Sequence, residues 1–283
     1  MYLYVLRMEE SMVKKLYQYT TLESLALILK SKNIRLNPLT NLDDLQEMQS
    51  QDEINYGRFV FISSWMDQPK ESIAMWKLYS NMYSGVRIGL QEYPFKKYFV
   101  TSEKVKEYFA SINLSGVGVT GESTELILPV EKCYNKEYLL LNPIYDDVLE
   151  SVQYTDDESL INPRLIEGEK NGFSMSTKKL GKYKNTYWEF QREKRYILRF
   201  VPGDFSIMMS SGKVAEYIYN KLQNEFFSHF DLAISNEAFE SIEITMAPQF
   251  TEGNRVLLRT LCEKYNPSAK IIESELKDRI NAK

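Results

Sequence analysis

The order in which strand-like and helix-like segments follow one another constrains the fold of this chain most. The clearest buried strand is the run RFVFISSW at residues 58–65, and an amphipathic helix is predicted after it at 71–81. Further strands are predicted at 14–20 and 86–90, and a further helix at 253–265. Because the strands are short and do not alternate strictly with helices, we expect an α+β fold with a mixed, largely antiparallel sheet core and flanking helices.

Chain length sets looser limits on the domain organisation. A chain of 283 residues can form one domain or two. The stretch at 155–184 is polar and contains Pro163, Gly168, Gly172 and Gly181. This composition predicts either an exposed insertion or a flexible covering loop.

The charge balance bears on the class of partner. The formal net charge is −4 and the sequence pI is about 5.4, so no general excess of positive charge can neutralise a phosphate backbone. Broad nucleic-acid binding is therefore disfavoured. A local basic run contains Lys178, Lys179, Lys182 and Lys184, and we interpret it as a solvated loop rather than a basic face.

Cysteine, histidine and apolar runs limit the kinds of site and the compartment. The two cysteines, Cys133 and Cys262, are far apart, and His229 is the only histidine. These residues give no disulfide framework and no metal-ligand spacing, so no metal site is expected. No stretch reaches the roughly 18 apolar residues of a membrane span, and we expect a cytoplasmic protein without a membrane partner.

The first candidate site is the segment at 188–195, WEFQREKR. In a strand, Gln191, Glu193 and Arg195 would point to one face, spaced about 7 Å apart. In a helix, Gln191 would instead lie beside Arg195. A strand with this row forms either a salt-bridged sheet surface or the floor of a polar pocket.

The second candidate site combines a strand end with a following helix. Ser63 lies near the predicted end of the strand at 58–65, and Trp76 and Tyr79 lie on the helix after it. A hydroxyl group beneath an aromatic wall could hold a ribose or a planar base by hydrogen bonding and stacking. The alternative is a core tryptophan with a serine that caps the helix.

Two further groups of residues could form a binding site, but each also has a simpler structural explanation. Tyr17 and Tyr19 share one face of the first predicted strand, where they could line a ligand site or pack in the core. Asp43, Asp44 and Glu47 could hold magnesium, but carboxylates also gather at the positive end of a helix dipole. We predict an acidic turn or a short helix at 43–48 and favour an acidic helix start over a magnesium site for these three residues.

The order of several motifs resembles a bacterial family known only as domain of unknown function 2971. The segments that carry the resemblance are LYQYTTLESLALILKSKNIRL, DDLQE, FISSW, MWKLYSNMYSGVRIGL, VQY, WEFQREKRYIL and IEITMAP. They cover nearly the whole chain, which implies a single domain over residues 1–283. The sequence departs from the family pattern at Gln18, where a basic residue is usual, and at Gln191, where the family has an acid.

The segment Gln191-Arg192-Glu193 is also similar to the [QE]-x-E motif of ADP-ribosyltransferases. Ser63 matches the hydroxyl residue that such enzymes carry on an earlier strand, although their first-strand Arg or His is absent. The resemblance implies an NAD-consuming ADP-ribosyltransferase-like or glycohydrolase-like enzyme, for example a bacterial defence or toxin effector, with NAD as substrate. The implied catalytic residues are Glu193 and Gln191, and the implied substrate-binding residues are Tyr17, Tyr19, Ser63, Trp76, Tyr79 and Arg195.

Two non-enzymatic hypotheses use the same residues. In the first, the chain is a nucleotide-binding sensor or an interaction module of a multi-protein system, and it holds a nucleotide-like small molecule without turnover. In the second, it is a purely structural protein partner with no polar pocket, which predicts that Glu193 and Arg195 are exposed to bulk water.

Overall fold

The computed structural model describes residues 14–52, 55–112, 121–169, 172–204, 220–221 and 226–280. Its strands are β1 (Lys15–Thr21), β2 (Asn33–Pro38), β3 (Val60–Met66), β4 (Gly85–Gln91), β5 (Tyr98–Thr101), β6 (Ser123–Leu126), β7 (Tyr138–Leu140), β8 (Leu149–Ser151), β9 (Gln153–Tyr154), β10 (Ile166–Glu169), β11 (Gly172–Met175), β12 (Tyr183–Lys184), β13 (Glu193–Pro202), β14 (Phe230–Ala233), β15 (Glu243–Met246) and β16 (Lys270–Ile272). Its α-helices are α1 (Leu22–Ser31), α2 (Ile73–Tyr79), α3 (Ser102–Ser111), α4 (Val130–Cys133), α5 (Glu158–Ile161), α8 (Asn236–Glu240) and α9 (Glu252–Tyr265). The 3₁₀ helices are η1 (Leu39–Asn41), η2 (Tyr56–Phe59), η3 (Tyr145–Asp147) and η4 (Thr186–Gln191).

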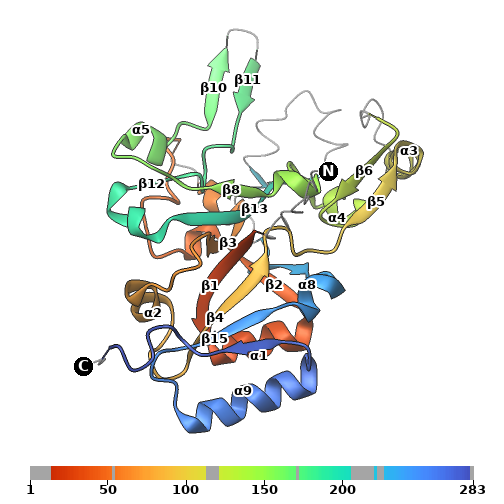
Figure 1. Cartoon of the computed structure of the whole chain (residues 1–283). Coiled ribbons are helices and arrows are strands. Elements are labelled where there is room, and N and C mark those ends of the chain that lie inside the picture. The colour runs from red at the N-terminus through yellow and green to blue at the C-terminus, as the bar shows by residue number, and fades with distance from the viewer. Residues whose placement is uncertain are drawn as a thin grey trace, which may run out of the picture.

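One ten-stranded sheet forms the centre of the fold (Figure 1). Its main path runs β14-β2-β3-β1-β4-β15-β16, and β13 pairs with β3 and continues the sheet to β7 and β8. All of these pairings are antiparallel except the parallel pair β15–β16. The predicted α+β fold with a mixed, largely antiparallel sheet and flanking helices is therefore confirmed.

The central strands are held by a continuous apolar core. Leu16, Val86, Ile88 and Ile244 are almost fully buried where β1, β4 and β15 lie side by side. Helices α1 and α9 cover this end of the sheet, while β13, β3 and β8 lie at the other end (Figure 1). Burial of one apolar face against helices explains why these strands and helices form together.

The sheet opens between β1 and β2 along one edge of β3. Strand β1 meets β3 only at the pair Tyr17–Met66, and β2 pairs with β3 only through Asn37 and Pro38. The amide of Gln18 enters the gap between these pairings and donates hydrogen bonds to the Ser64 carbonyl oxygen at 3.1 Å and to Ser63 Oγ at 3.3 Å. A side chain thus replaces part of the missing backbone ladder.

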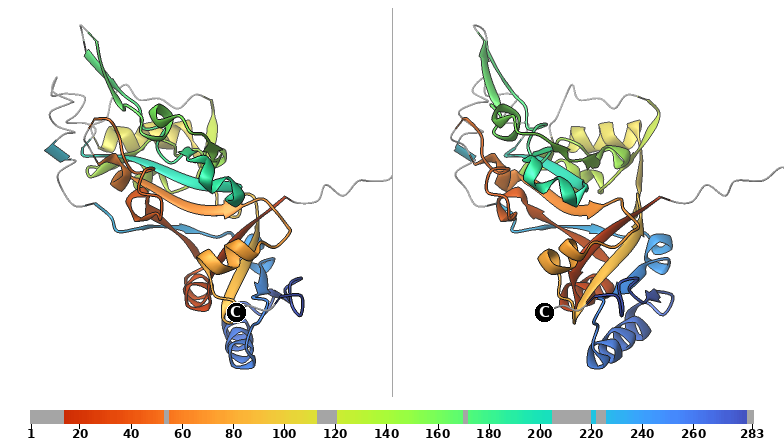
Figure 2. Two further views of the ribbon diagram at one scale, coloured as in Figure 1. Left: turned by 90° about the vertical axis from the view of Figure 1, so that its left-hand side faces the viewer. Right: turned by 60° about the vertical axis from the view of Figure 1, so that its left-hand side comes forward.

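The stretch at 155–184, predicted as an insertion or covering loop, contains α5, the β10–β11 hairpin and β12. The hairpin projects from the molecule in the views of Figure 2. We call residues 177–184 the covering segment, because it lies over β13: Arg199 donates to the Thr177 and Leu180 carbonyl oxygens, both at 3.2 Å. Gly181 has a φ of 74°, which glycine adopts without strain, and this turn leads into β12.

Two predicted elements have different bounds in the structure. In the segment at 188–195, the strand begins only at Glu193, and the residues before it form η4. The acidic stretch at 43–48, predicted to be a turn or a short helix, contains a turn, and the favoured helix start is not formed. In that turn, Asp44 Oδ1 accepts a hydrogen bond from the Gln46 backbone N–H at 3.0 Å, which favours a turn over a continuing helix.

Candidate functional site

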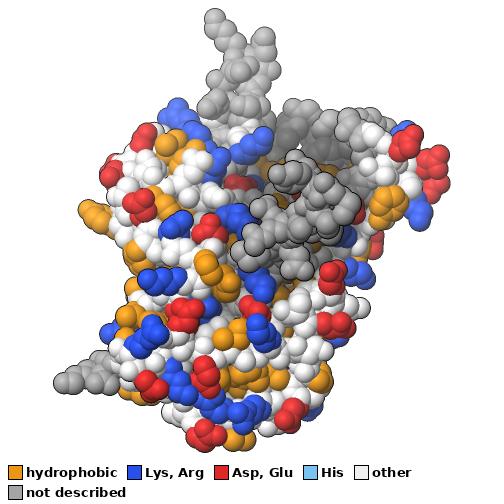
Figure 3. All heavy atoms as spheres, in the orientation of Figure 1, with side chains coloured by type: hydrophobic (Ala, Val, Ile, Leu, Met, Phe, Trp, Pro, Cys, Tyr) orange, Lys and Arg blue, Asp and Glu red, His pale blue; other side chains and the backbone are white. Residues whose placement is uncertain are grey.

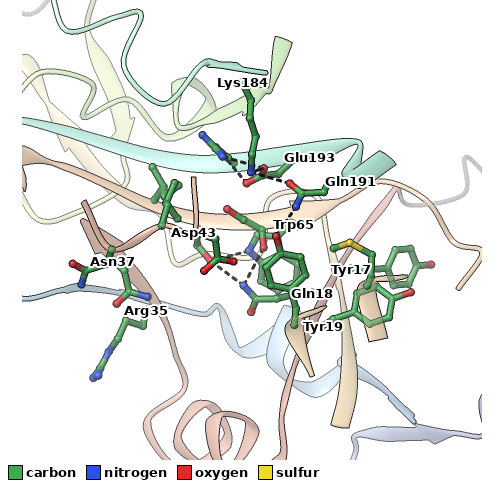
Figure 4. A pocket seen from close by; sticks show the side chains of 18 residues that line it. Tyr17, Gln18, Tyr19, Arg35, Asn37, Asp43, Trp65, Lys184, Gln191 and Glu193 are labelled. Atoms are coloured by element: carbon green, nitrogen blue, oxygen red, sulfur yellow. Dashed lines mark hydrogen bonds and ion pairs between the residues drawn. The ribbon is translucent and has the colours of Figure 1, made fainter. Parts of the chain in front are cut away.

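A cavity of about 230 Å³ lies at the opening of the sheet (Figure 4). Its walls come from β1, β2, β3, α2, β12, η4, β13 and the residues that follow β2. This volume is below the roughly 300–1,000 Å³ of many small-molecule sites, so the cavity would enclose one end of a larger ligand. Segments far apart in sequence, from Tyr17 to Arg195, thus meet at one concave surface.

Four charged side chains form what we call the ionic floor: Lys184, Glu193 and Arg195 line the cavity, and Glu47 binds Arg195 and Lys184. Arg195 Nε donates to Glu193 Oε1 at 2.7 Å, and its Nη2 donates to Glu193 Oε2 at 3.0 Å and to Glu47 Oε1 at 3.1 Å. Lys184 Nζ lies 3.2 Å from Glu47 Oε1 and 3.3 Å from Glu193 Oε2. Two cations therefore face two carboxylates.

The ionic floor is buried, and its Glu193 is ionised. Arg195 is 0% exposed and Glu193 is 6% exposed. Burial acts to raise the pKa of Glu193, but the charges of Arg195 and Lys184 outweigh it and lower this pKa to about 2. At neutral pH Glu193 is thus a hydrogen-bond acceptor and a fixed negative charge, and it is poorly suited to proton transfer.

Neighbouring groups fix the positions of Glu193 and Gln191. The Glu193 backbone N–H donates to the Tyr154 hydroxyl at 2.8 Å. Gln191 accepts from Lys184 Nζ at 2.9 Å through its side-chain oxygen and donates to the Tyr79 hydroxyl through its side-chain nitrogen. Burial, followed by the charges of nearby carboxylates, raises the pKa of Tyr79, so its hydroxyl stays protonated and can donate a hydrogen bond.

The backbone turn at Arg192 explains why Gln191 and Glu193 both reach the cavity. Arg192 has a φ of 45°, which is uncommon for a residue other than glycine, and it follows directly after η4. Gln191 and Glu193 are buried, whereas Arg192 is exposed and lies against Gln68 on the other side of β13. Of the two alternatives for the segment at 188–195, neither holds throughout: Gln191 ends η4 and Glu193 begins β13, and both residues line one site.

Ser63 of β3, the strand paired with β13, also lines the cavity. Its Oγ accepts hydrogen bonds from Gln18 Nε2 at 3.3 Å and from Trp65 Nε1 at 3.0 Å. Because both contacts use the oxygen as acceptor, the hydroxyl proton can be donated toward a ligand. Ser63 lies in the middle of β3 instead of near its end, where the open strand edge gives it access to the cavity.

Trp76 does not form the predicted aromatic wall. It is 0% exposed, its ring packs edge-on against Tyr19, and its Nε1 donates to Glu71 Oε2 at 2.8 Å. It is therefore a core residue with a satisfied indole N–H, and its assignment to substrate binding is wrong. Tyr79 and Met75 of the same helix line the cavity instead.

Tyr17 and Tyr19 border the cavity but direct their rings away from Gln18 (Figure 4). The Tyr19 hydroxyl accepts from the Ser72 backbone N–H at 2.9 Å, and the Arg87 guanidinium lies 4.5 Å from the Tyr17 ring centre. The alternation of side chains along β1 places Gln18 on the cavity side. Tyr17 and Tyr19, predicted to bind substrate, could therefore contact a ligand only at the edge of the cavity.

Several residues of the site were missed or assigned elsewhere from the sequence, and Asp43 is one of them. Glu47 was grouped with an acidic helix start, Lys184 with a solvated basic loop, and Gln18 was noted only as a departure from a family pattern. Glu47 is 1% exposed and Lys184 5% exposed, and their contacts join segments far apart in sequence. The prediction of the purely structural hypothesis that Glu193 and Arg195 are exposed to bulk water is wrong, because both are buried at a cavity.

Within the described ranges, no cluster of three or more His, Cys, Asp or Glu side chains is arranged to hold a metal ion. In the same ranges, no helix combines the length and apolar character needed to cross a membrane. On the face shown in Figure 3, basic and acidic side chains are interspersed and form no single basic patch.

Comparisons of the chain with protein-family models, with curated proteins and with solved structures find no match. The resemblances to domain of unknown function 2971 and to ADP-ribosyltransferases therefore stay predictions, and the function has to be argued from the cavity itself.

Proposed function

We propose that the cavity binds a nucleotide-like small molecule by a sugar and a planar ring, and that NAD is the first ligand to test. The observation that carries the proposal is the meeting of Ser63, Tyr79 and Glu193 at one cavity, although they belong to β3, α2 and β13. Sites for small molecules combine an apolar wall with a few convergent polar groups, and this cavity has both.

The polar groups suit the hydroxyls of a ribose. Glu193 accepts hydrogen bonds, Ser63 can donate one, and the protonated Tyr79 hydroxyl can do either. Met75, Ile62 and the Tyr79 ring give an apolar surface for a planar group. A sugar joined to a flat ring would use both kinds of surface at once.

Cleavage of NAD is the second candidate function. Gln191 and Glu193 meet Ser63 at the cavity, and Glu193 carries a negative charge that could stabilise positive charge developing on the ribose carbon. The C–N bond would break, nicotinamide would leave with the electron pair, and water or an acceptor would attack the sugar. The cations of the ionic floor already offset the charge of Glu193, which is why we rank binding first.

Binding is tested by calorimetry with NAD and by the thermal stability of the protein in its presence. A specific ligand at 100 times its Kd should stabilise the protein by about 2.7 kcal/mol. Tyr79→Phe should weaken NAD binding by about three- to tenfold, since it removes one hydrogen-bonding hydroxyl at the cavity. Tyr187→Phe, the same change at a residue that is 86% exposed, serves as the matched control and should bind normally.

Cleavage is tested by incubating the protein with NAD and measuring the release of nicotinamide, with water, cell lysate or nucleic acid as acceptors. Glu193→Gln should abolish release, and the exposed Glu189→Gln should preserve it. An enzyme of this kind would act as a bacterial defence or toxin effector. Binding of NAD without release by the wild type would support a sensor or interaction module and reject the enzymatic candidate.

A further inference from the structure

The cations that line the cavity already have carboxylate partners. Lys184 and Arg195 are paired within the ionic floor, as described above. Arg35, which lines the cavity from β2, has its Nε 3.1 Å from Asp231 Oδ1 on the neighbouring strand β14. A phosphate that entered the cavity would have to compete with these carboxylates for each cation.

Asp43 is the contrasting group on the wall. It lines the cavity and is exposed, and the described part of the chain gives its carboxylate no ion pair or hydrogen bond. The negative charges of Asp43 and Glu193 both raise the pKa of Tyr79, in addition to the larger effect of burial. The Asp43 carboxylate therefore faces the same space as the Tyr79 hydroxyl and leaves one negative charge on the wall uncompensated.

We propose that Asp43 makes the cavity selective for a cationic ring, so that the oxidised nicotinamide end of a nicotinamide nucleotide enters it and the phosphates stay outside. This inference rests on the proposed function. A positively charged ring gains attraction from Asp43, whereas a phosphate is repelled by it. The small cavity volume also favours entry of one end of the dinucleotide, as argued above.

NAD and NADH provide a direct test, because the nicotinamide ring is cationic in NAD and neutral in NADH while the rest of the molecule is the same. An exposed charge pair contributes modestly, so the wild type should bind NAD about two- to fivefold more tightly than NADH. Asp43→Asn should remove this preference by weakening NAD binding. Asp147→Asn, the same change at an exposed residue of η3 outside the cavity wall, should retain it.

Calorimetric titration of the three proteins with NAD, NADH and ADP-ribose separates the outcomes, with thermal unfolding to confirm that each variant is folded. Equal or tighter binding of NADH by the wild type would overturn the inference and leave the proposed function in place. Weaker ADP-ribose binding by Asp43→Asn would also overturn it, because a carboxylate that repels phosphate cannot help to hold ADP-ribose. No binding of any of the three ligands would reject the proposed function itself.

Discussion

Arg195 and Arg199 lie on the same face of β13, four residues apart, and both are buried, but their partners differ in kind. Arg195 is bound mainly by the carboxylates of Glu47 and Glu193, and it also donates to the Gly181 backbone carbonyl oxygen of the covering segment at 3.0 Å. Arg199 is bound mainly by backbone carbonyl oxygens of the covering segment, with Glu150 as its one carboxylate. The first arrangement builds a charged floor for the cavity, and the second attaches a loop to the sheet. The type and burial of a side chain therefore do not define its role, whereas its partners do.

The largest effect is expected from Arg195→Ala. It would leave Glu47 and Glu193 buried with only Lys184 to compensate them, and removing one partner of a buried ion pair typically costs about 3–5 kcal/mol. Lys194→Ala, at the adjacent residue on the opposite face, removes a partly exposed pair with Glu92 and should cost less than about 1 kcal/mol. Urea unfolding of both variants measures the difference, and similar losses would remove the distinction between floor and surface.

Acid unfolding tests whether Glu193 is ionised in the folded protein. The folded pKa of Glu193 is about 2, compared with an ordinary value of 4.5. Its contribution to the free energy of unfolding is therefore fully present above pH 4.5 and is lost as the pH falls from 4.5 towards 2. This shift corresponds to about 3 kcal/mol.

The free energy of unfolding of Glu193→Gln should accordingly fall less steeply over this pH range than that of the wild type. Glu189→Gln changes an exposed residue and is the matched control, expected to follow the wild-type curve. If the wild type and Glu193→Gln gave parallel curves, Glu193 would have an ordinary pKa and the floor would not be ion-paired as the structure has it.

Arg199→Ala should have a smaller and more local effect. Its loss leaves the carbonyl oxygens of Thr177 and Leu180 without their arginine donors, and an unsatisfied buried group costs about 1–3 kcal/mol. Hydrogen exchange should accelerate in the covering segment, at the amides of Leu180 and Lys182, before it does so in β3. Uniform acceleration through the sheet would show that Arg199 supports the whole core as Arg195 does.

Much of the fold follows from local sequence patterns. The apolar run that becomes β3, the strands β1 and β4, and the periodic helix α9 are all predicted near their observed positions, because burial of an apolar face repeats at the period of the element. The end of η4 at Arg192 was not predicted, because a left-handed backbone conformation at an arginine has no compositional signal.

The site was predicted in part, and for a physical reason. Glu193, Gln191 and Arg195 stand close together in sequence, so their polar pattern is visible. Glu47 lies 148 residues from Arg195, and nothing local to either residue indicates that they will meet. Trp76 was misassigned because a tryptophan in a core and one in a ligand wall have the same composition and helical spacing.

The smallest expected effect is that of Thr177→Val, and it isolates the difference between the two arginines. Thr177 is 3% exposed, and its carbonyl oxygen accepts from Arg199 while its hydroxyl has no hydrogen-bond partner among the described residues. Valine keeps the carbonyl and replaces an unsatisfied hydroxyl with a methyl group of similar shape, so stability should change by less than about 0.5 kcal/mol or increase slightly. Glu47→Gln, by contrast, alters the side chain that Arg195 binds and should cost several times more. If Thr177→Val were as destabilising as Glu47→Gln, Arg199 would depend on side-chain identity in the covering segment, and the contrast between backbone and carboxylate recognition would fail.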